Sequence, residues 1–252
     1  MVERKIGKHT VQYYDSIDEL PIVRFHKYQK FLLVDSGIGG DINSFDARLE
    51  RTRLYLTQGK MDEADKELRN MRQSIYLIQQ GINPKHRAFA TLVTRIDDER
   101  FDTITDDVVE RICAKLSDVR LIDLAVSLEA AKKKIDAELM LYFPRLFNDS
   151  DIKEYFDILR RRTVEILNNI VKGKRRPDKT EVVENLNARL ITYSNPKEFT
   201  GSEGVEVQFD RQFENLCLVL SEQLHVKPKE YTVMEFYNAF DFIQDRAKQN
   251  KK

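Results

Sequence analysis

The sequence predicts a mostly helical protein. Of its 252 residues only nine are Gly and six are Pro, so long segments contain no helix-breaking residue. Within these segments apolar side chains recur with the period of an amphipathic helix. We therefore expect an all-α fold of about ten helices. It would contain helical hairpins, an extended N-terminal arm and at most a small β-hairpin or strand near residues 192–210.

Composition narrows the class of protein. Lys and Arg number 42, and so do Asp and Glu, which gives a formal net charge of zero. A neutral chain has no overall attraction to nucleic acid or to a membrane, so any such contact must come from a local patch. Cys113 and Cys217 lie among apolar neighbours and are predicted to be reduced core thiols. No stretch approaches the ~20 apolar residues of a membrane helix, and we expect synthesis in the cytoplasm.

The first elements are an arm and a hairpin. Residues 1–20 are predicted to be extended, and their aromatic side chains would dock on a neighbouring molecule. Two helices, the second over 62–80, are joined by the short link Gly59-Lys60, which predicts an antiparallel helical hairpin. Residues 56–64 resemble the turn of a tetratricopeptide repeat. No second copy follows about 34 residues later, so we expect a single hairpin.

Capping residues mark the helices that follow. Asn83 precedes Pro84, a pair that is typical of an N-cap and first helical position. Thr105 precedes Asp106 and Asp107, whose charges suit a helix N-terminus. Asn43 or Ser44, and Asp149 or Ser150, are further candidate N-caps. The remaining helices are predicted over 121–143, 151–171, 179–193, 211–224 and 232–248.

The stretch 192–210 is the least regular. Val205, Val207 and Phe209 alternate with polar residues, so a single strand or hairpin arm is expected there.

The predicted elements divide the chain into four segments. They are the arm 1–20, a main helical domain 21–171, a basic loop with a short helix and irregular arm 172–210, and a C-terminal helical pair 211–252.

No motif for chemistry is found. The four histidines show no metal-binding spacing, and His26 is predicted to be a partly buried structural residue. The Gly-rich loop 36–41 lacks the Lys of a phosphate-binding loop. Asp97, Asp98 and Asp102 lack the spacing of a calcium loop. We therefore predict a protein that is not an enzyme, with no cofactor, no metal and no small-molecule substrate.

Charge is segregated along the chain. Seven acids between Asp97 and Glu110 are opposed only by Arg100. Eight cations form a basic block opposed only by Glu165 and Asp178. The basic block is Arg160, Arg161, Arg162, Lys172, Lys174, Arg175, Arg176 and Lys179. It could meet the acidic block of a neighbouring copy, face DNA phosphates, or simply be a solvated helix end.

Two helices carry more apolar surface than one face buries. The segment 22–34 is apolar almost all round, and in the last helix Phe242 lies about 180° from Val233. Such helices are either central to a core or shared with a partner. We predict partner contact. The candidate subunit-interface residues are Tyr13, Tyr14, Phe25, Phe31, Asp97, Asp98, Asp106, Asp107 and Phe242.

Three segments carry a resemblance to a known family. Residues 20–39, 72–78 and 82–86 resemble virion proteins of tailed phages, notably the crAss-like phages of gut Bacteroidetes. The resemblance covers the first half of the chain better than the second, and no catalytic residue carries over from it. It implies a head-to-tail connector of the virion, a subunit of a homo-oligomeric ring at the portal–tail junction.

The resemblance also implies partners and alternatives. The partners would be copies of the chain, the portal, other tail or ring proteins, and packaged DNA through the basic block. One alternative is a tail-assembly chaperone or scaffold, which is absent from mature virions. Another is a cytosolic helical adaptor that binds one host or phage protein.

Overall fold

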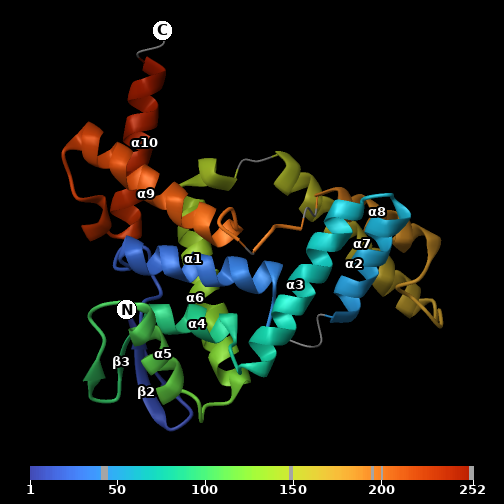
Figure 1. The fold of residues 1–252 in the computed structure, drawn as a ribbon, viewed down its shortest axis with the longest axis horizontal. Helices are drawn as coiled ribbons and strands as arrows, with labels where there is room; N and C mark the ends of the chain where they lie inside the picture. Colours follow the sequence, from blue (N-terminus) through green and yellow to red (C-terminus); the bar gives the residue numbers. More distant parts are fainter. Residues whose placement is uncertain (41–44, 148–149, 194–195, 200, 250–252) are drawn as a thin grey trace.

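A computed structural model describes residues 1–40, 45–147, 150–193, 196–199 and 201–249. Over these residues the chain forms ten α-helices and a small four-stranded antiparallel sheet (Figure 1). The predicted mostly helical class is thus confirmed. The candidate caps Asn43, Ser44 and Asp149 lie outside the described residues, and nothing is described of the Ser150 side chain.

The elements follow one another with short connections. In chain order they are β1 (Val2–Ile6), β2 (His9–Tyr13), α1 (Ile22–Gly37), α2 (Phe45–Thr57), α3 (Met61–Gln79), α4 (Pro84–Leu92), β3 (Val93–Ile96), β4 (Glu99–Arg100), α5 (Asp106–Lys115), α6 (Leu121–Tyr142), η2 (Pro144–Phe147), α7 (Ser150–Val171), α8 (Glu181–Tyr193), α9 (Val205–Leu224), η3 (Pro228–Glu230) and α10 (Val233–Gln249).

The prediction of an extended N-terminal arm is wrong, because residues 2–13 form a β-hairpin that belongs to the protein's own sheet. β1 pairs with β2 around a two-residue turn, in which Gly7 has φ +60°. β2 then pairs with β3, so Val11 lies opposite Ile96. Val11 and Tyr13 point into the core and are buried. The short Gly-containing turn between two extended runs was the signal for this hairpin.

Helix α1 lies at the centre of the main core. It packs against α4, and α9 and α10 lie on its other side (Figure 1). Phe25 and Tyr28 of α1 are both buried. The core extends from Ile6 to Phe143 and takes in residues 217–236. Because α1 is surrounded by the chain's own elements, its all-round apolar surface reflects a central position and not a shared one.

A buried arginine joins α1 to the sheet. Arg24 Nη1 donates to the carbonyl oxygens of Thr91 and Val93, at 3.0 and 2.9 Å. Its Nη2 donates to the carbonyl oxygens of Phe101 and Thr103. Carbonyl oxygens at the end of α4 carry partial negative charge and accept from the cation. Arg24 therefore fixes the place where α4 turns into β3.

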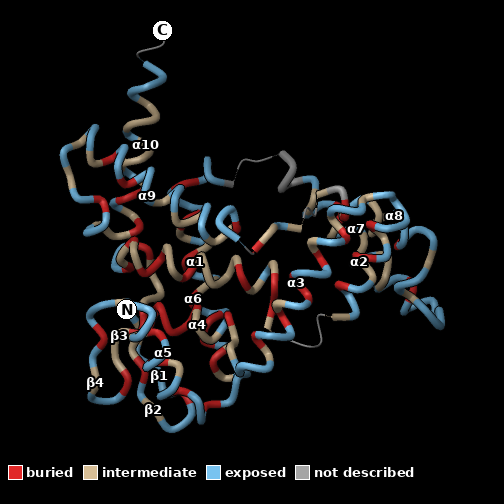
Figure 2. Tube along the Cα trace, in the orientation of Figure 1, coloured by how far each residue is buried: buried red, intermediate tan, exposed pale blue. Residues whose placement is uncertain are grey.

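A smaller lobe is built from two helical hairpins. The predicted α2–α3 hairpin is confirmed, and α7 and α8 form a second one beside it (Figure 1). The core between them is small and centres on Tyr55, Ala64 and Ile191. Figure 2 shows that much of this lobe is exposed. The predicted boundary at residue 171 falls inside the α7–α8 hairpin, so it separates two helices that pack against each other.

The expected strand near 192–210 is also wrong. Val205, Val207 and Phe209 lie in the first turns of α9, which begins after Gly204. The spacing of Phe209, Phe213 and Cys217 is helical, and it outweighs three alternating residues. The pair α9–α10 shares the main core rather than forming a segment of its own. Two other predictions hold: Asn83 and Thr105 accept hydrogen bonds as N-caps of α4 and α5.

Candidate functional site

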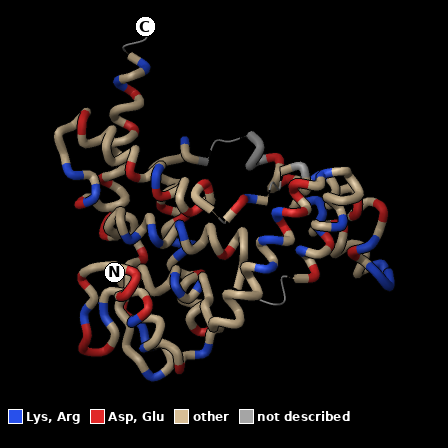
Figure 3. Tube along the Cα trace, in the orientation of Figure 1, with Lys and Arg blue, Asp and Glu red and all other residues tan. Residues whose placement is uncertain are grey.

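The basic block lies on the α7–α8 hairpin. Arg160, Arg161 and Arg162 belong to α7, and four of the other cations lie in the loop 172–176. Figure 3 shows this loop as the basic tip at one end of the long axis. Because every side chain of residues 172–176 is exposed, the loop is a free surface of the protein.

Most of this block has no acidic partner. Lys179 Nζ pairs with Glu50 Oε1 at 3.2 Å, and Arg162 Nε donates to Asn187 Oδ1 at 2.5 Å. The other six cations make no ion pair with any carboxylate in the described part of the chain. They are Arg160, Arg161, Lys172, Lys174, Arg175 and Arg176. The unpaired positive charge is therefore concentrated in the loop 172–176, whereas Arg160 and Arg161 line a groove together with Asp157 and Glu165.

The acidic block is different, because the fold compensates much of it. Asp97 begins the tight turn between β3 and β4, with φ +52°. Its Oδ2 lies 2.7 Å from His9 Nδ1, and its Oδ1 accepts from the Thr10 amide at 2.9 Å. The hydrogen bond with His9 is the main cause that lowers the pKa of Asp97. Asp106, at the start of α5, pairs with Lys27.

Of the remaining acids of this block, some form ion pairs and others do not. Glu99 pairs with Arg111 and Lys115, and Glu110 pairs with Arg87. Three acids of the block are left without an ion pair among the described residues. These three are Asp98, Asp102 and Asp107. Within the described part of the chain, this acidic block therefore offers fewer free charges than the basic block.

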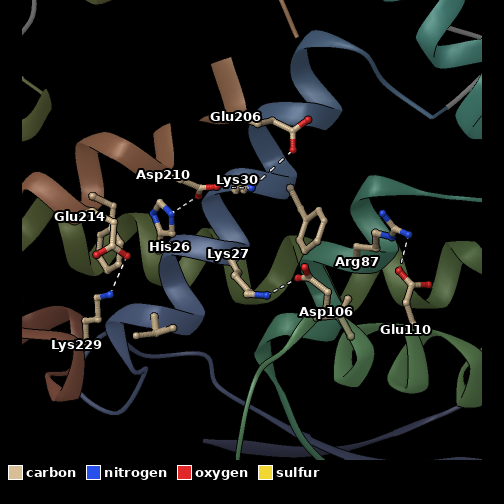
Figure 4. A pocket seen from close by; sticks show the side chains of 14 residues that line it. His26, Lys27, Lys30, Arg87, Asp106, Glu110, Glu206, Asp210, Glu214 and Lys229 are labelled. Atoms are coloured by element: carbon tan, nitrogen blue, oxygen red, sulfur yellow. Dashed lines mark hydrogen bonds and ion pairs between the residues drawn. The ribbon is translucent and has the colours of Figure 1, made fainter. Parts of the chain in front are cut away.

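An open groove of about 620 Å³ lies beside α1 (Figure 4). Helices α4, α5 and α9 form its other walls. The charged side chains in it are paired across the walls, as Figure 4 shows. The pairs are Lys27 with Asp106, Arg87 with Glu110, Lys30 with Asp210 and Glu206, His26 with Asp210, and Lys229 with Glu214.

His26 is the most constrained residue of the groove. Its Nε2 lies 2.8 Å from Asp210 Oδ1, and its ring is stacked between Phe209 and Phe213 at 4.6 and 4.1 Å. Burial lowers the pKa of His26, although Asp210 opposes that effect. His26 is therefore a partly buried residue that fastens α9 to α1, in agreement with its predicted structural role.

The pKa values of the two acids that face Lys30 are shifted in opposite directions. Burial raises the pKa of Glu206, since Lys30 Nζ is 3.9 Å away and compensates it weakly. Burial also acts on Asp210, but hydrogen bonds from Lys30 and His26 outweigh it and lower the pKa of Asp210. Divergent pKa values can assign an acid and a base at an active site. Here both acids contact α1 cations, which is what a polar seam between two helices requires.

Sequence reasoning missed this seam. Lys27 and Lys30 lie on α1, whereas Glu206 and Asp210 lie on α9, about 180 residues later. The i, i+4 spacing of the two acids, matched by His26 and Lys30, was the only local signal. Such spacing is common on solvated helices, so it does not identify a contact between two distant segments.

Five aromatic residues were predicted to lie at a subunit interface. The prediction is wrong for two of them, which are buried, and one of the others is exposed. Tyr13 and Phe25 are each 3% exposed and belong to the main core. Tyr14 and Phe31 are half-buried against the same core. Phe242 is 53% exposed, with the Arg246 guanidinium 5.6 Å from its ring centroid. The hairpin β1–β2 and the central position of α1 explain why the first two are inaccessible.

Helix α7 has an outward apolar stripe that the sequence analysis did not single out. Phe156, Leu167 and Val171 are 60%, 55% and 87% exposed, and Val164 is nearly half exposed. At 100° per residue they fall on one face, roughly opposite the buried Ile158. A groove of about 540 Å³ lies beside them, between α7 and α8. The stripe is therefore a second feature of the hairpin that carries the basic block.

Further observations bear on metals, membranes and thiols. In the described residues no group of three His, Cys, Asp or Glu side chains is placed to hold a metal ion. None of the described helices is long and apolar enough to cross a membrane. Cys113 and Cys217 are free thiols, and burial raises the pKa of Cys113 to about 12.

Comparison with known proteins found no relative of this chain. No protein family matches the chain, and no curated protein or solved structure matches it either.

Proposed function

We propose that this protein is a structural subunit of a tailed-phage virion that assembles with its own copies into a ring at the portal–tail junction. The observation that carries the proposal is the outward apolar stripe of α7. Phe156, Leu167 and Val171 lie in water although they are large and apolar. They share this face of α7 with the exposed Arg160, and exposed apolar side chains of this kind are typical of a surface that a partner covers.

Further exposed apolar side chains lie elsewhere on the chain. Ile122 and Leu141 of α6 are exposed, and so is Phe242 of α10. Two different surfaces on one subunit allow head-to-tail contacts, which close into a ring when the rotation between neighbours permits. The elongated shape, with the α7–α8 hairpin at one end, separates these surfaces (Figure 1). The portal and other tail or ring proteins are the further partners that the resemblance to virion proteins implies.

The groove beside α1 supports a structural role rather than catalysis. Its cations and acids pair with one another, and it contains no Ser, Thr or Cys that could serve as a nucleophile beside His26. Its charges hold α9 against α1 and α4 against α5. We therefore propose no reaction, cofactor or small-molecule substrate for this protein.

Native mass spectrometry tests the ring. The purified chain, alone or with portal, should give one fixed copy number above one. The variant Leu167→Glu with Val171→Glu should lower that number, because it places charge in the covered stripe. The same change at Leu49 and Leu56, which are about as exposed as Leu167 but lie on α2, is the matched control and should leave it unchanged.

Proteomics of purified particles decides between the classes of protein. A virion subunit is present in mature particles at the copy number of the ring. Absence from particles, with presence in assembly intermediates, would show a chaperone or scaffold instead. A chain that stays monomeric and co-purifies with one host or phage protein would show an adaptor.

A further inference from the structure

The α7–α8 hairpin concentrates positive charge that the rest of the described chain does not neutralise. Four cations occur within the five residues 172–176, and Arg160 and Arg161 line the adjoining groove of α7, together with Asp157 and Glu165. An unpaired cluster of this density repels itself, and a bound polyanion relieves that repulsion. The hairpin is therefore suited to a partner with many negative charges.

The loop is held in place by a buried side chain. Asn169 is fully buried near the end of α7, and its Nδ2 donates to the Pro177 carbonyl at 3.0 Å and to Thr180 Oγ1 at 3.1 Å. The Lys174 amide donates to the Asn169 carbonyl at 3.0 Å. These bonds tie both halves of the loop to α7. The cations are consequently presented from a fixed backbone.

The composition of the loop indicates which polyanion fits. Residues 172–180 contain no aromatic side chain to stack on a base and, apart from Pro177, no apolar side chain to enter a lipid layer. The acidic block of a second copy has only Asp98, Asp102 and Asp107 free in the described chain, against six cations. A phosphate backbone supplies the missing charge, and a duplex carries one charge per ~1.7 Å of its axis.

We propose that the α7–α8 hairpin binds the phosphate backbone of double-stranded DNA without reading its sequence. Arg160 lies on α7, and Lys172 directly follows the last residue of α7, twelve residues later, which is ~18 Å along the helix direction. That length corresponds to about five base-pair steps. The inference does not rest on the ring, since one copy carries all six cations.

Fluorescence anisotropy with a labelled 30-base-pair duplex tests it. If all six cations meet phosphates, the affinity should fall on the order of a thousandfold between 50 and 200 mM salt. The tip variant Lys172→Gln, Lys174→Gln, Arg175→Gln, Arg176→Gln should bind about tenfold more weakly or worse, with a salt dependence of only roughly tenfold. Two duplexes of unrelated sequence should bind equally.

A matched control removes the same charge elsewhere. Arg4→Gln, Lys5→Gln, Arg72→Gln and Lys133→Gln alter four exposed cations outside the hairpin that also form no ion pair with the described residues. This variant should bind the duplex like the unmodified protein, and both variants should melt at the unmodified temperature. Equal losses of affinity in the two variants would overturn the proposal. So would binding to polyglutamate or to vesicles of anionic lipid but not to the duplex.

Discussion

The main core and the α7–α8 hairpin use apolar residues in opposite ways. In the main core, Phe89 and Leu116 are fully buried and every neighbour is part of the same chain. On α7, Phe156 and Val171 are mostly exposed, and the helix packs against α8 through its other side. Figure 2 shows the same contrast between the two ends of the molecule.

This difference separates the residues that stabilise the fold from those that we propose to be covered by a partner. Burial of apolar area stabilises the fold by about 25 cal/mol per Å², and that term resides in the main core. The outer face of α7 adds almost nothing to the isolated chain, so its apolar residues have another use. The charges follow a similar division, because Lys27 and Arg87 near the main core are paired, whereas the cations of the loop 172–176 form no ion pair with the described residues.

Matched leucine substitutions should show the largest effect. Leu116→Ala removes a fully buried side chain, and we expect a loss of about 2–5 kcal/mol in the free energy of unfolding. Leu167→Ala alters an exposed side chain, and its effect should stay within about 0.5 kcal/mol. Urea unfolding measures both. A loss at Leu167 comparable to that at Leu116 would mean that the stripe belongs to the protein's own core.

Much of the helical fold could be predicted, because its signals are local. The helix expected over 121–143 is α6 at Leu121–Tyr142. Its buried apolar residues recur at the spacing of a helix along its whole length. The sheet was missed because β2 and β3 are short and far apart in sequence. Asp97 was assigned to an acidic patch, yet it forms a turn. Pairing of distant short strands leaves no periodic signal in either one.

The candidate sites divide in the same way. The basic block was visible in the sequence, because its cations are neighbours along one hairpin. The seam around His26 was not, since its partner Asp210 is on another helix. Tyr13 and Phe25 were assigned to a surface because aromatic residues alone do not show which side is covered. Only the packing of β1–β2 and α9 against them decides that.

Acidification should weaken the seam at the main core and leave the hairpin unchanged. Burial lowers the pKa values of His26 and His86, so the folded chain favours the neutral rings. The unfolded chain binds protons first as the pH falls below about 6.5. Stability is therefore lost from that pH downwards. The raised pKa of Glu206 opposes this loss, because the folded chain binds that proton before the unfolded chain does. The lowered pKa of Asp210 costs stability only below the ordinary value of 3.8, outside this window.

Replacing His26 isolates its share of that loss. The urea midpoint of the unmodified protein should fall between pH 7 and pH 5.5, by less than the Leu116→Ala effect. His26→Gln should reduce this fall, whereas His225→Gln, at an exposed position, should not. An unchanged pH dependence in His26→Gln would assign the loss to other groups.

Alanine substitutions at two glycines should show the smallest difference in stability between the two regions. Gly7 and Gly173 both have positive φ, +60° and +70°, so alanine at either is strained by about 1 kcal/mol or more. A Cβ at Gly7 would also lie 3.3 Å from Val119 Cγ2 in the main core, whereas nothing lies within 4 Å of one at Gly173. Gly7→Ala should therefore destabilise the chain more than Gly173→Ala, by a few tenths of a kcal/mol. Thermal melting of the two variants side by side measures the difference, and an equal loss would show that Val119 yields to the added methyl group.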